Sequence, residues 1–114
     1  MAQNRNKIIG LFIGNLVNAV LHRILEKAIF DNPEIAIKYR KETRNSWDIA
    51  KDYREKINPK TEGLLARDAE EIRNKTISRI KSELAIRIAK GYKNLNLDVV
   101  EKEVDDALQE MKVS

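Results

Sequence analysis

The residue best suited to acid–base or metal chemistry in this 114-residue chain is its single histidine, His22. Glu26 lies four residues further on, so on a helix the two side chains would share one face and could offer two ligands to a metal ion. A closed metal site usually needs about four ligands, and the chain has no cysteine and no second histidine. We therefore expect no metal ion and no other cofactor.

The polar residues Asn15, Asn18 and His22 form a line within an otherwise apolar helical pattern. Such a line favours a buried polar seam that fixes the register between packed helices. Its members would need hydrogen bonds, because an unsatisfied buried polar group costs about 1–3 kcal/mol. A metal or acid–base role for His22 and simple surface exposure of the line are the alternatives.

Two carboxylates, Glu103 and Asp106, form an E-x-x-D pair downstream of Glu83. This pattern resembles the all-α nucleotide pyrophosphohydrolases of the MazG type, in which two helices offer an E-x-x-E and an E-x-x-D pair to magnesium. The resemblance implies a magnesium-dependent nucleotide hydrolase with these acids as ligands. Ile80 and Ile86 stand where the second acid beside Glu83 belongs, so the resemblance implies a degenerate member at best.

Nucleophilic catalysis finds no support in the residue types. Any of Ser46, Ser78 and Ser82 would have to use His22 as its base, and none stands in the strained turn of a nucleophile elbow. Phosphate-binding loops rich in glycine are also missing from the sequence. We expect no intrinsic catalysis.

Basic residues gather ahead of the single tryptophan, Trp47. The four that precede it on one predicted helix are Lys38, Arg40, Lys41 and Arg44. Cations beside an aromatic ring could bind phosphates and stack bases. Acids are interleaved with them, which favours helix-stabilising pairs on a solvated surface. Nucleic-acid contact by this segment is therefore possible but not favoured.

The composition predicts one all-α domain over residues 1–114. Hydrophobic residues make up 42% of the chain and charged residues 35%, with a formal net charge of +4, four glycines and two prolines. Helix formers dominate and no alternation typical of strands occurs. Apolar periodicity predicts a small four-helix bundle-like domain with helices over 6–30, 33–57, 62–90 and 97–111.

Local signals mark several of these helix ends. Asn32 and Pro33 suit an N-cap and the first helical position, and Asn58 precedes a proline that disfavours helix. Gly91 suits the residue just past a helix, and Asn96 suits the cap of the next one. Whether the second helix is continuous stays open.

The first predicted helix is apolar around nearly its whole circumference. A surface helix of a small bundle buries only a stripe, whereas a helix that is apolar all round is surrounded. Three further helices cover only part of it, so we expect a second copy of the chain, most simply a homodimer, packed against it. The predicted oligomer interface consists of Gly10, Phe12, Ile13, Gly14, Val17 and Leu21. Gly10 and Gly14 would let a second backbone approach closely, by analogy with membrane helices.

The apolar segment 8–25 is interrupted by polar residues, so we expect no membrane span. The lack of cysteine fits a reducing interior, and we expect a cytoplasmic protein; the wealth of Ile, Lys, Glu and Arg is typical of heat-adapted proteins.

The last predicted helix is acidic, with six acids between Asp98 and Glu110. We expect it to lie beside a basic neighbour in its own fold or in a partner subunit. An acidic mimic, or a basic face elsewhere that binds nucleic acid, is the alternative.

The favoured function is an interaction or structural module that forms a homo-oligomer, and a different protein is a further possible partner. Nucleic-acid binding through the second and third helices and the degenerate MazG-like hydrolase are the alternatives.

Overall fold

The computed structural model describes residues 5–29, 31–58 and 63–113 of the chain. Its elements are three long helices followed by a 3₁₀ turn and a short helix: α1 (Arg5–Ala28), α2 (Pro33–Ile57), α3 (Ala66–Ala89), η2 (Leu97–Val99) and α4 (Val100–Glu110). No strand occurs in the described ranges. The predicted all-α class is therefore confirmed.

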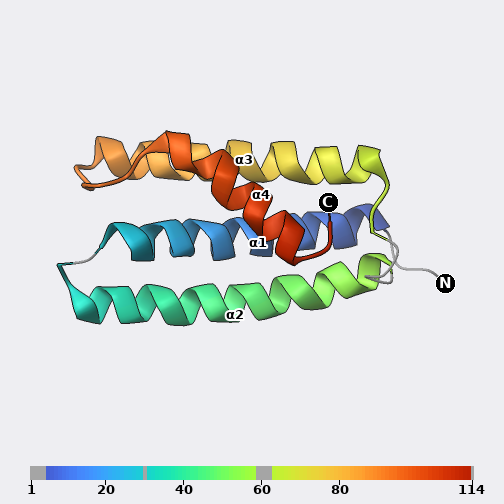
Figure 1. The fold of residues 1–114 in the computed structure, drawn as a ribbon, viewed down its shortest axis with the longest axis horizontal. Coiled ribbons are helices and arrows are strands. Elements are labelled where there is room, and N and C mark those ends of the chain that lie inside the picture. Colours follow the sequence, from blue (N-terminus) through green and yellow to red (C-terminus); the bar gives the residue numbers. More distant parts are fainter. Residues whose placement is uncertain (1–4, 30, 59–62, 114) are drawn as a thin grey trace.

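Helix α1 lies at the centre of an elongated body (Figure 1). The body measures 48 × 23 × 22 Å along its principal axes. α2 and α3 flank α1, with α3 running in the same direction as α1 and α2 running against both. α4 crosses diagonally over α1 and α3 on one side of this layer. α1 therefore contacts every other α-helix of the bundle.

The apolar circumference of α1 is covered within one chain. Twelve of its residues are buried: Ile8, Ile9, Phe12, Ile13, Leu16, Val17, Ala19, Val20, Leu21, Ile24, Leu25 and Ala28. Nine of them, all but Ile8, Ala19 and Ala28, form one core cluster with residues of α3 and α4, among them Ile72, Ile80, Leu84, Val100, Val104 and Leu108.

Four residues of the predicted oligomer interface therefore belong to the protomer's own core. Phe12 and Ile13 are 0% and 1% exposed, and Val17 and Leu21 are buried with them. The reason is that one cluster of buried residues from α1, α2, α3 and α4 includes all four, and Val17 and Leu21 also line a cleft that α1 forms with α3. The expectation that a lone chain leaves α1 uncovered is corrected in this respect, while the homodimer itself stays a prediction.

The ends of α2 follow the sequence signals. Asn32 Oδ1 accepts a hydrogen bond from the backbone N–H of Ile35 (3.3 Å), and Pro33 occupies the first turn. α2 then runs without a break over the predicted span 33–57 and ends before Asn58, whose backbone is extended. The open question of its continuity is thereby answered.

The ends of α3 agree less well with the predicted span 62–90. α3 begins at Ala66 rather than near residue 62, because Gly63 has a φ of +66° and Leu65 is still extended. The predicted start at residues 61 and 62 lies outside the described residues. At its other end, the N–H of Tyr92 donates to the Arg87 carbonyl and that of Gly91 to the Ile88 carbonyl, both at 3.0 Å. This is the Schellman pattern, with Gly91 at a φ of +99°.

The first and last predicted helices are also shorter than expected. α1 ends at Ala28, two residues before the predicted end. Asn96 caps the last helical segment as predicted, with its Oδ1 accepting from the N–H of Asp98 at 2.8 Å. That segment begins as the 3₁₀ turn η2 and becomes α-helical only at Val100.

A fully buried arginine on α2 holds the end of α4. Arg54 is 0% exposed, and its Nε and Nη2 donate to the carbonyls of Met111 (3.1 Å) and Lys112 (2.8 Å). Its Nη1 donates to the carbonyl (3.2 Å) and Oδ1 (2.7 Å) of Asn58. Burial lowers the pKa of Arg54, yet a guanidinium stays protonated in proteins. One cation thus joins the C-terminal ends of α2 and α4, where helix dipoles favour positive charge.

We predict that Arg54→Ala lowers the free energy of unfolding by about 3 kcal/mol or more, because it leaves several buried carbonyls without donors. Arg54→Lys should lose less, since an ammonium keeps the charge but cannot span all these acceptors. Urea denaturation measures both. Lys51→Ala, at an exposed position of the same helix, is the control and should change stability by no more than about 0.5 kcal/mol. Equal stability of Arg54→Ala and Lys51→Ala would contradict the role of Arg54.

Lys112 occupies a position that favours glycine. Its φ is +61°, and the bonds from Val113 N–H to the Leu108 carbonyl (2.9 Å) and from Lys112 N–H to the Gln109 carbonyl (3.2 Å) repeat the Schellman pattern at the end of α4. The lysine side chain is exposed. Only the backbone conformation of Lys112 therefore sets the preference at this site.

We predict that Lys112→Gly raises the free energy of unfolding by about 0.5–1 kcal/mol, because it removes the steric cost of the left-handed conformation. Thermal denaturation followed by circular dichroism checks this. Lys93→Gly, at an exposed position in the turn after α3 whose φ is not positive, should bring no gain. A stabilised Lys93→Gly with an unchanged Lys112→Gly would refute the explanation.

Candidate functional site

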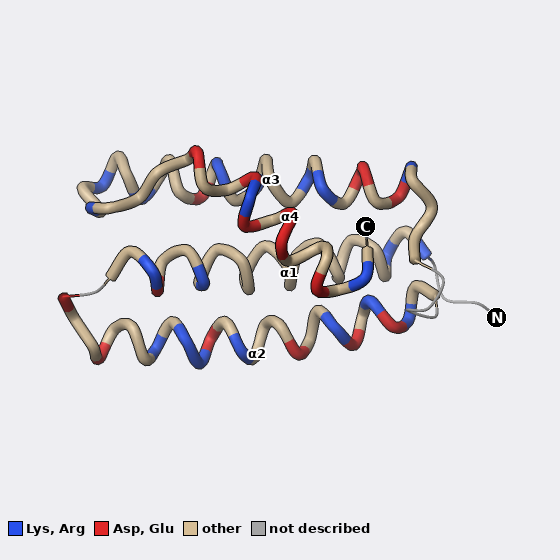
Figure 2. Tube along the Cα trace, in the orientation of Figure 1, with Lys and Arg blue, Asp and Glu red and all other residues tan. Residues whose placement is uncertain are grey.

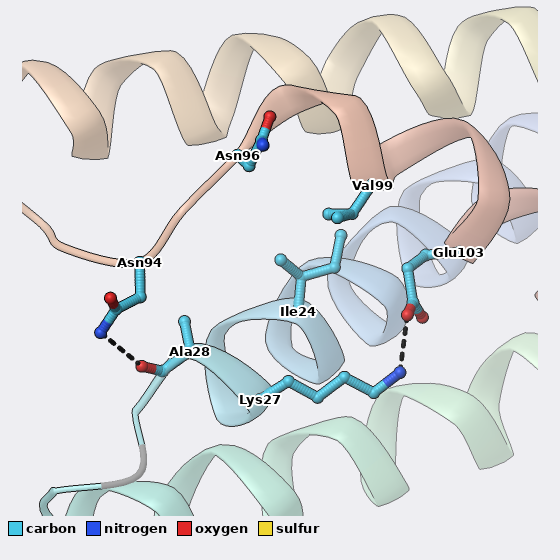
Figure 3. A pocket seen from close by; sticks show the side chains of 7 residues that line it. All are labelled: Ile24, Lys27, Ala28, Asn94, Asn96, Val99 and Glu103. Atoms are coloured by element: carbon cyan, nitrogen blue, oxygen red, sulfur yellow. Dashed lines mark hydrogen bonds and ion pairs between the residues drawn. The ribbon is translucent and has the colours of Figure 1, made fainter.

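One cleft lies beside the C-terminal end of α1, and we call it the loop cleft (Figure 3). Its volume is about 250 Å³, and its lining residues are Ile24, Lys27, Ala28, Asn94, Asn96, Val99 and Glu103. Ile24 and Ala28 form part of its apolar base.

The polar groups of the loop cleft bond to one another or to the backbone. Lys27 Nζ reaches across to Glu103 Oε1 at 2.6 Å, and Asn94 Nδ2 donates to the Ala28 carbonyl at 3.4 Å (Figure 3). The side-chain oxygen of Asn96 caps η2. The loop cleft therefore offers apolar surface and few polar groups that are not already bonded.

A second cleft lies between α1 and α3, and we call it the α1–α3 cleft. Its volume is about 380 Å³. α1 contributes Val17, Asn18, Leu21 and His22. α3 contributes Ser78, Arg79, Ser82, Glu83 and Arg87. This cleft is richer in hydrogen-bond donors and charges than the loop cleft.

His22 bonds at both ring nitrogens. Nδ1 lies 2.7 Å from the Asn18 carbonyl oxygen and Nε2 lies 2.8 Å from Glu42 Oε2 on α2. Both partners are hydrogen-bond acceptors. The ring centroid also lies 5.8 Å from that of Tyr39. His22 thus links α1 to α2 at one wall of the α1–α3 cleft.

The predicted polar seam lies at the surface of the protomer rather than inside it. Asn18 is exposed, and Asn15 and His22 are half-buried. Asn15 Nδ2 donates to the Leu11 carbonyl of its own helix at 2.9 Å. The expectation of a buried seam is therefore corrected for the single chain: Asn18 lies on a side of α1 that the other helices leave open, whereas His22 faces α2.

The carboxylates behind the MazG-like resemblance do not converge. Glu83 lines the α1–α3 cleft and accepts from Arg87 Nη1 at 2.9 Å, whereas Glu103 lines the loop cleft and pairs with Lys27. Asp106 Oδ2 pairs with Lys102 at 2.9 Å. No group of three potential metal ligands occurs among the residues that the structure describes. The arrangement gives a magnesium site no support.

Acids of α4 pair with bases of its own fold. Glu103 and Glu110 meet Lys27 (2.6 Å) and Arg23 (3.5 Å) of α1. Asp105 and Glu101 meet Arg73 (2.7 Å) and Lys81 (3.2 Å) of α3. Acidic and basic positions accordingly face one another where α4 crosses (Figure 2). The prediction of a basic neighbour for this helix is confirmed.

These charge pairs also perturb two bases. A side-chain hydrogen bond to Asp105 raises the pKa of Arg73, and one to Asp106 raises the pKa of Lys102. Pairs at such exposed positions contribute at most about 1 kcal/mol each. They orient α4 more than they stabilise it.

The basic segment of α2 is partly neutralised. Arg40 Nε pairs with Glu26 Oε1 at 2.7 Å. The guanidinium of Arg23 lies 4.6 Å from the Trp47 ring centroid, so that ring already has a cation against it. Lys38, Lys41 and Arg44 are exposed and have no ion pair with any residue in the described ranges. These three residues are the part of the predicted nucleic-acid contact whose charges remain available to bind phosphates.

One face of α1 stays open around its two glycines. Gly10 is exposed and Gly14 half-buried, and Leu11 between them is 39% exposed. A Cβ placed on either glycine would meet no heavy atom within 4 Å. No other element of the described chain approaches α1 closely at this face.

By length and composition alone, α1 could also cross a membrane. The core helix of a folded bundle can have the same length and composition, and 56% of the most apolar 18-residue stretch of α1 is buried in the protein.

Comparison with protein-family models, with curated proteins and with solved structures finds no match to this chain. Function is therefore inferred from the residues themselves.

Proposed function

We propose that this protein is a small helical interaction module that forms a homodimer through the open face of α1. The observation that carries the proposal is the pair of glycines, Gly10 and Gly14, one turn apart on that face with open space beside both. The proposed interface keeps these two residues of the predicted set and adds the exposed Leu11 between them.

The physical argument is the cost of glycine in a helix. Each glycine destabilises a helix interior by about 1 kcal/mol relative to alanine. Inside one chain an alanine would fit at both positions without contact, so intramolecular packing gives no reason for glycine. A second helix that crosses at this face would give one, because two glycines four apart let backbones approach closely.

Other features fit a module without chemistry of its own. The acids of α4 bind bases in the same fold, and the carboxylates of the hydrolase pattern lie in separate clefts. We do not propose the hydrolase function. A different protein at the same face of α1 is the alternative partner, and the lack of cysteine is in keeping with our proposal of a cytoplasmic setting.

We predict that Gly14→Ala weakens dimerisation by about tenfold or more, because a methyl group at a close helix crossing overpacks it by about 1–3 kcal/mol. Sedimentation equilibrium of the wild type and the variant measures this. In a protein that stays monomeric, the same change would instead stabilise the fold by about 0.5–1 kcal/mol through helix propensity. A homodimer therefore predicts weaker self-association of the variant, whereas a monomer predicts only a higher free energy of unfolding.

Asn74→Ala provides the matched control. Asn74 is exposed on α3, so alanine there raises helix propensity without touching α1. It should leave the dimerisation constant unchanged. A wild type that sediments as a monomer at high micromolar concentration, with Gly14→Ala only more stable, would rule out the homodimer.

Nucleic-acid binding is the second candidate, favoured by Lys38, Lys41 and Arg44 of α2, which are exposed and have no ion pair with the part of the chain that the structure describes. We predict that any binding of single-stranded RNA weakens steeply with salt, because each phosphate contact releases counterions. Replacing the three residues by glutamine should reduce the salt slope by about two to three units, which fluorescence anisotropy can measure.

The control for this triple variant removes the same charge elsewhere. Arg67, Lys90 and Lys93 are exposed, at the start of α3 and just beyond its end, and their replacement by glutamine should leave the slope nearly unchanged. Undetectable RNA binding at low salt, or equal losses in both triple variants, would exclude a contact by α2.

A further inference from the structure

The α1–α3 cleft contains one cation that the described residues leave without a counter-charge. Arg79 lines the cleft, is exposed, and forms no ion pair or hydrogen bond within the described ranges. The other arginine of the cleft is engaged, since Arg87 Nη1 binds Glu83 Oε2 (2.9 Å), and His22 Nε2 lies 2.8 Å from Glu42 Oε2. The cleft therefore carries the unbalanced charge of Arg79 and should attract an anion.

Neutral donors surround this cation. Ser78 and Ser82 lie one turn apart on α3, and both are exposed in the cleft. Asn18 faces them from α1, and its own side chain makes no hydrogen bond within the described part of the chain. Together with the guanidinium fork, these groups can donate to more oxygens than the two of a carboxylate. A phosphoryl group, with three terminal oxygens, matches such a donor set.

The size of the cleft points to a ligand larger than a free phosphate ion. Its volume is about 380 Å³, within the range of about 300–1,000 Å³ that is typical of small-molecule sites. Val17 and Leu21, both buried core residues, give the α1 side an apolar lining. We propose that the α1–α3 cleft binds a phosphate monoester with a planar or apolar body, a molecule of mononucleotide size, through Arg79, Ser78, Ser82 and Asn18.

The ligand site needs no contact of the proposed homodimer, but Asn18 lies one helical turn after Gly14 on the open side of α1, so the two sites are neighbours. It also differs from the hydrolase pattern, because it uses donors and a cation where that pattern needs a cluster of acids. No bond is made or broken in the proposed site; it binds the ligand and nothing more.

Isothermal titration calorimetry of the full chain at low salt tests the proposal with three probes: adenosine monophosphate, adenosine and inorganic phosphate. We expect adenosine monophosphate to bind most tightly, because it alone offers both the phosphoryl group and a planar body. Arg79→Gln should weaken its binding by about tenfold or more, since hydrogen bonds to charged groups are the strong ones. Ser82→Ala should weaken it by about threefold.

The matched control is Arg67→Gln, which removes an exposed arginine of the same helix outside the cleft and should leave binding unchanged. Circular dichroism shows whether each variant is folded. Adenosine binding as tightly as adenosine monophosphate, equal losses in the Arg67 and Arg79 variants, or no heat from any probe at millimolar concentration would each overturn the proposal. Amide shifts in ¹⁵N spectra that cluster at residues 17–22 and 78–87 would support it.

Discussion

The guanidinium of Arg54 is the constraint on which the architecture depends. Taking a cation out of water costs several kcal/mol unless its donors are satisfied, and this one is fully buried with oxygens of Asn58, Met111 and Lys112 around it. Asn58 in turn donates to the Gly63 carbonyl. The end of α2, Gly63 ahead of α3 and the end of α4 are therefore linked through Arg54 and Asn58, and α4 crosses α1 on its way to this point.

This crossing explains how a small chain buries a helix that is apolar on nearly every side. α2 and α3 flank α1, and α4 covers a further side of it. Ion pairs along both edges of α4, to Lys27 on α1 and to Arg73 on α3, hold it in that position. What stays uncovered on α1 is a face of mostly small and polar residues with the exposed Leu11 among them, and this face is available to partners and ligands.

Local signals in the sequence predicted most of the helix ends, because capping and turn residues determine these ends. Pro33 and the Asn58–Pro59 step bound α2 correctly, and Gly91 and Asn96 marked the turn before α4. The start of α3 was wrong because a positive φ at Gly63 delays the helix, which no residue pattern reveals by itself. Periodicity showed that Phe12 is buried against a neighbour but could not show that the neighbouring residues belong to the same chain.

The candidate site shows the same division between local and long-range information. His22 and Asn18 stood out from their own helix, but Arg79, Ser78 and Ser82 join them only through the register of α3 against α1, which is set by contacts distant in sequence. Arg54 was also missed, although a signal existed. Arg54 lies four residues after Ala50 and three before Ile57. This spacing places its charged side chain on the same face of the helix as these apolar residues.

The hydrogen bonds from Arg54 to the carbonyls of Met111 and Lys112 also have a consequence for synthesis on the ribosome. The carbonyls that this guanidinium needs are made long after Arg54 itself, and α4 is made after all three long helices. Until α4 and these carbonyls have been made, a nascent chain has an apolar first helix that α4 does not yet cover, and Arg54 lacks the acceptors that it has in the folded protein. Because such intermediates expose apolar surface, this protein should complete its core in one late step, once α4 has been made.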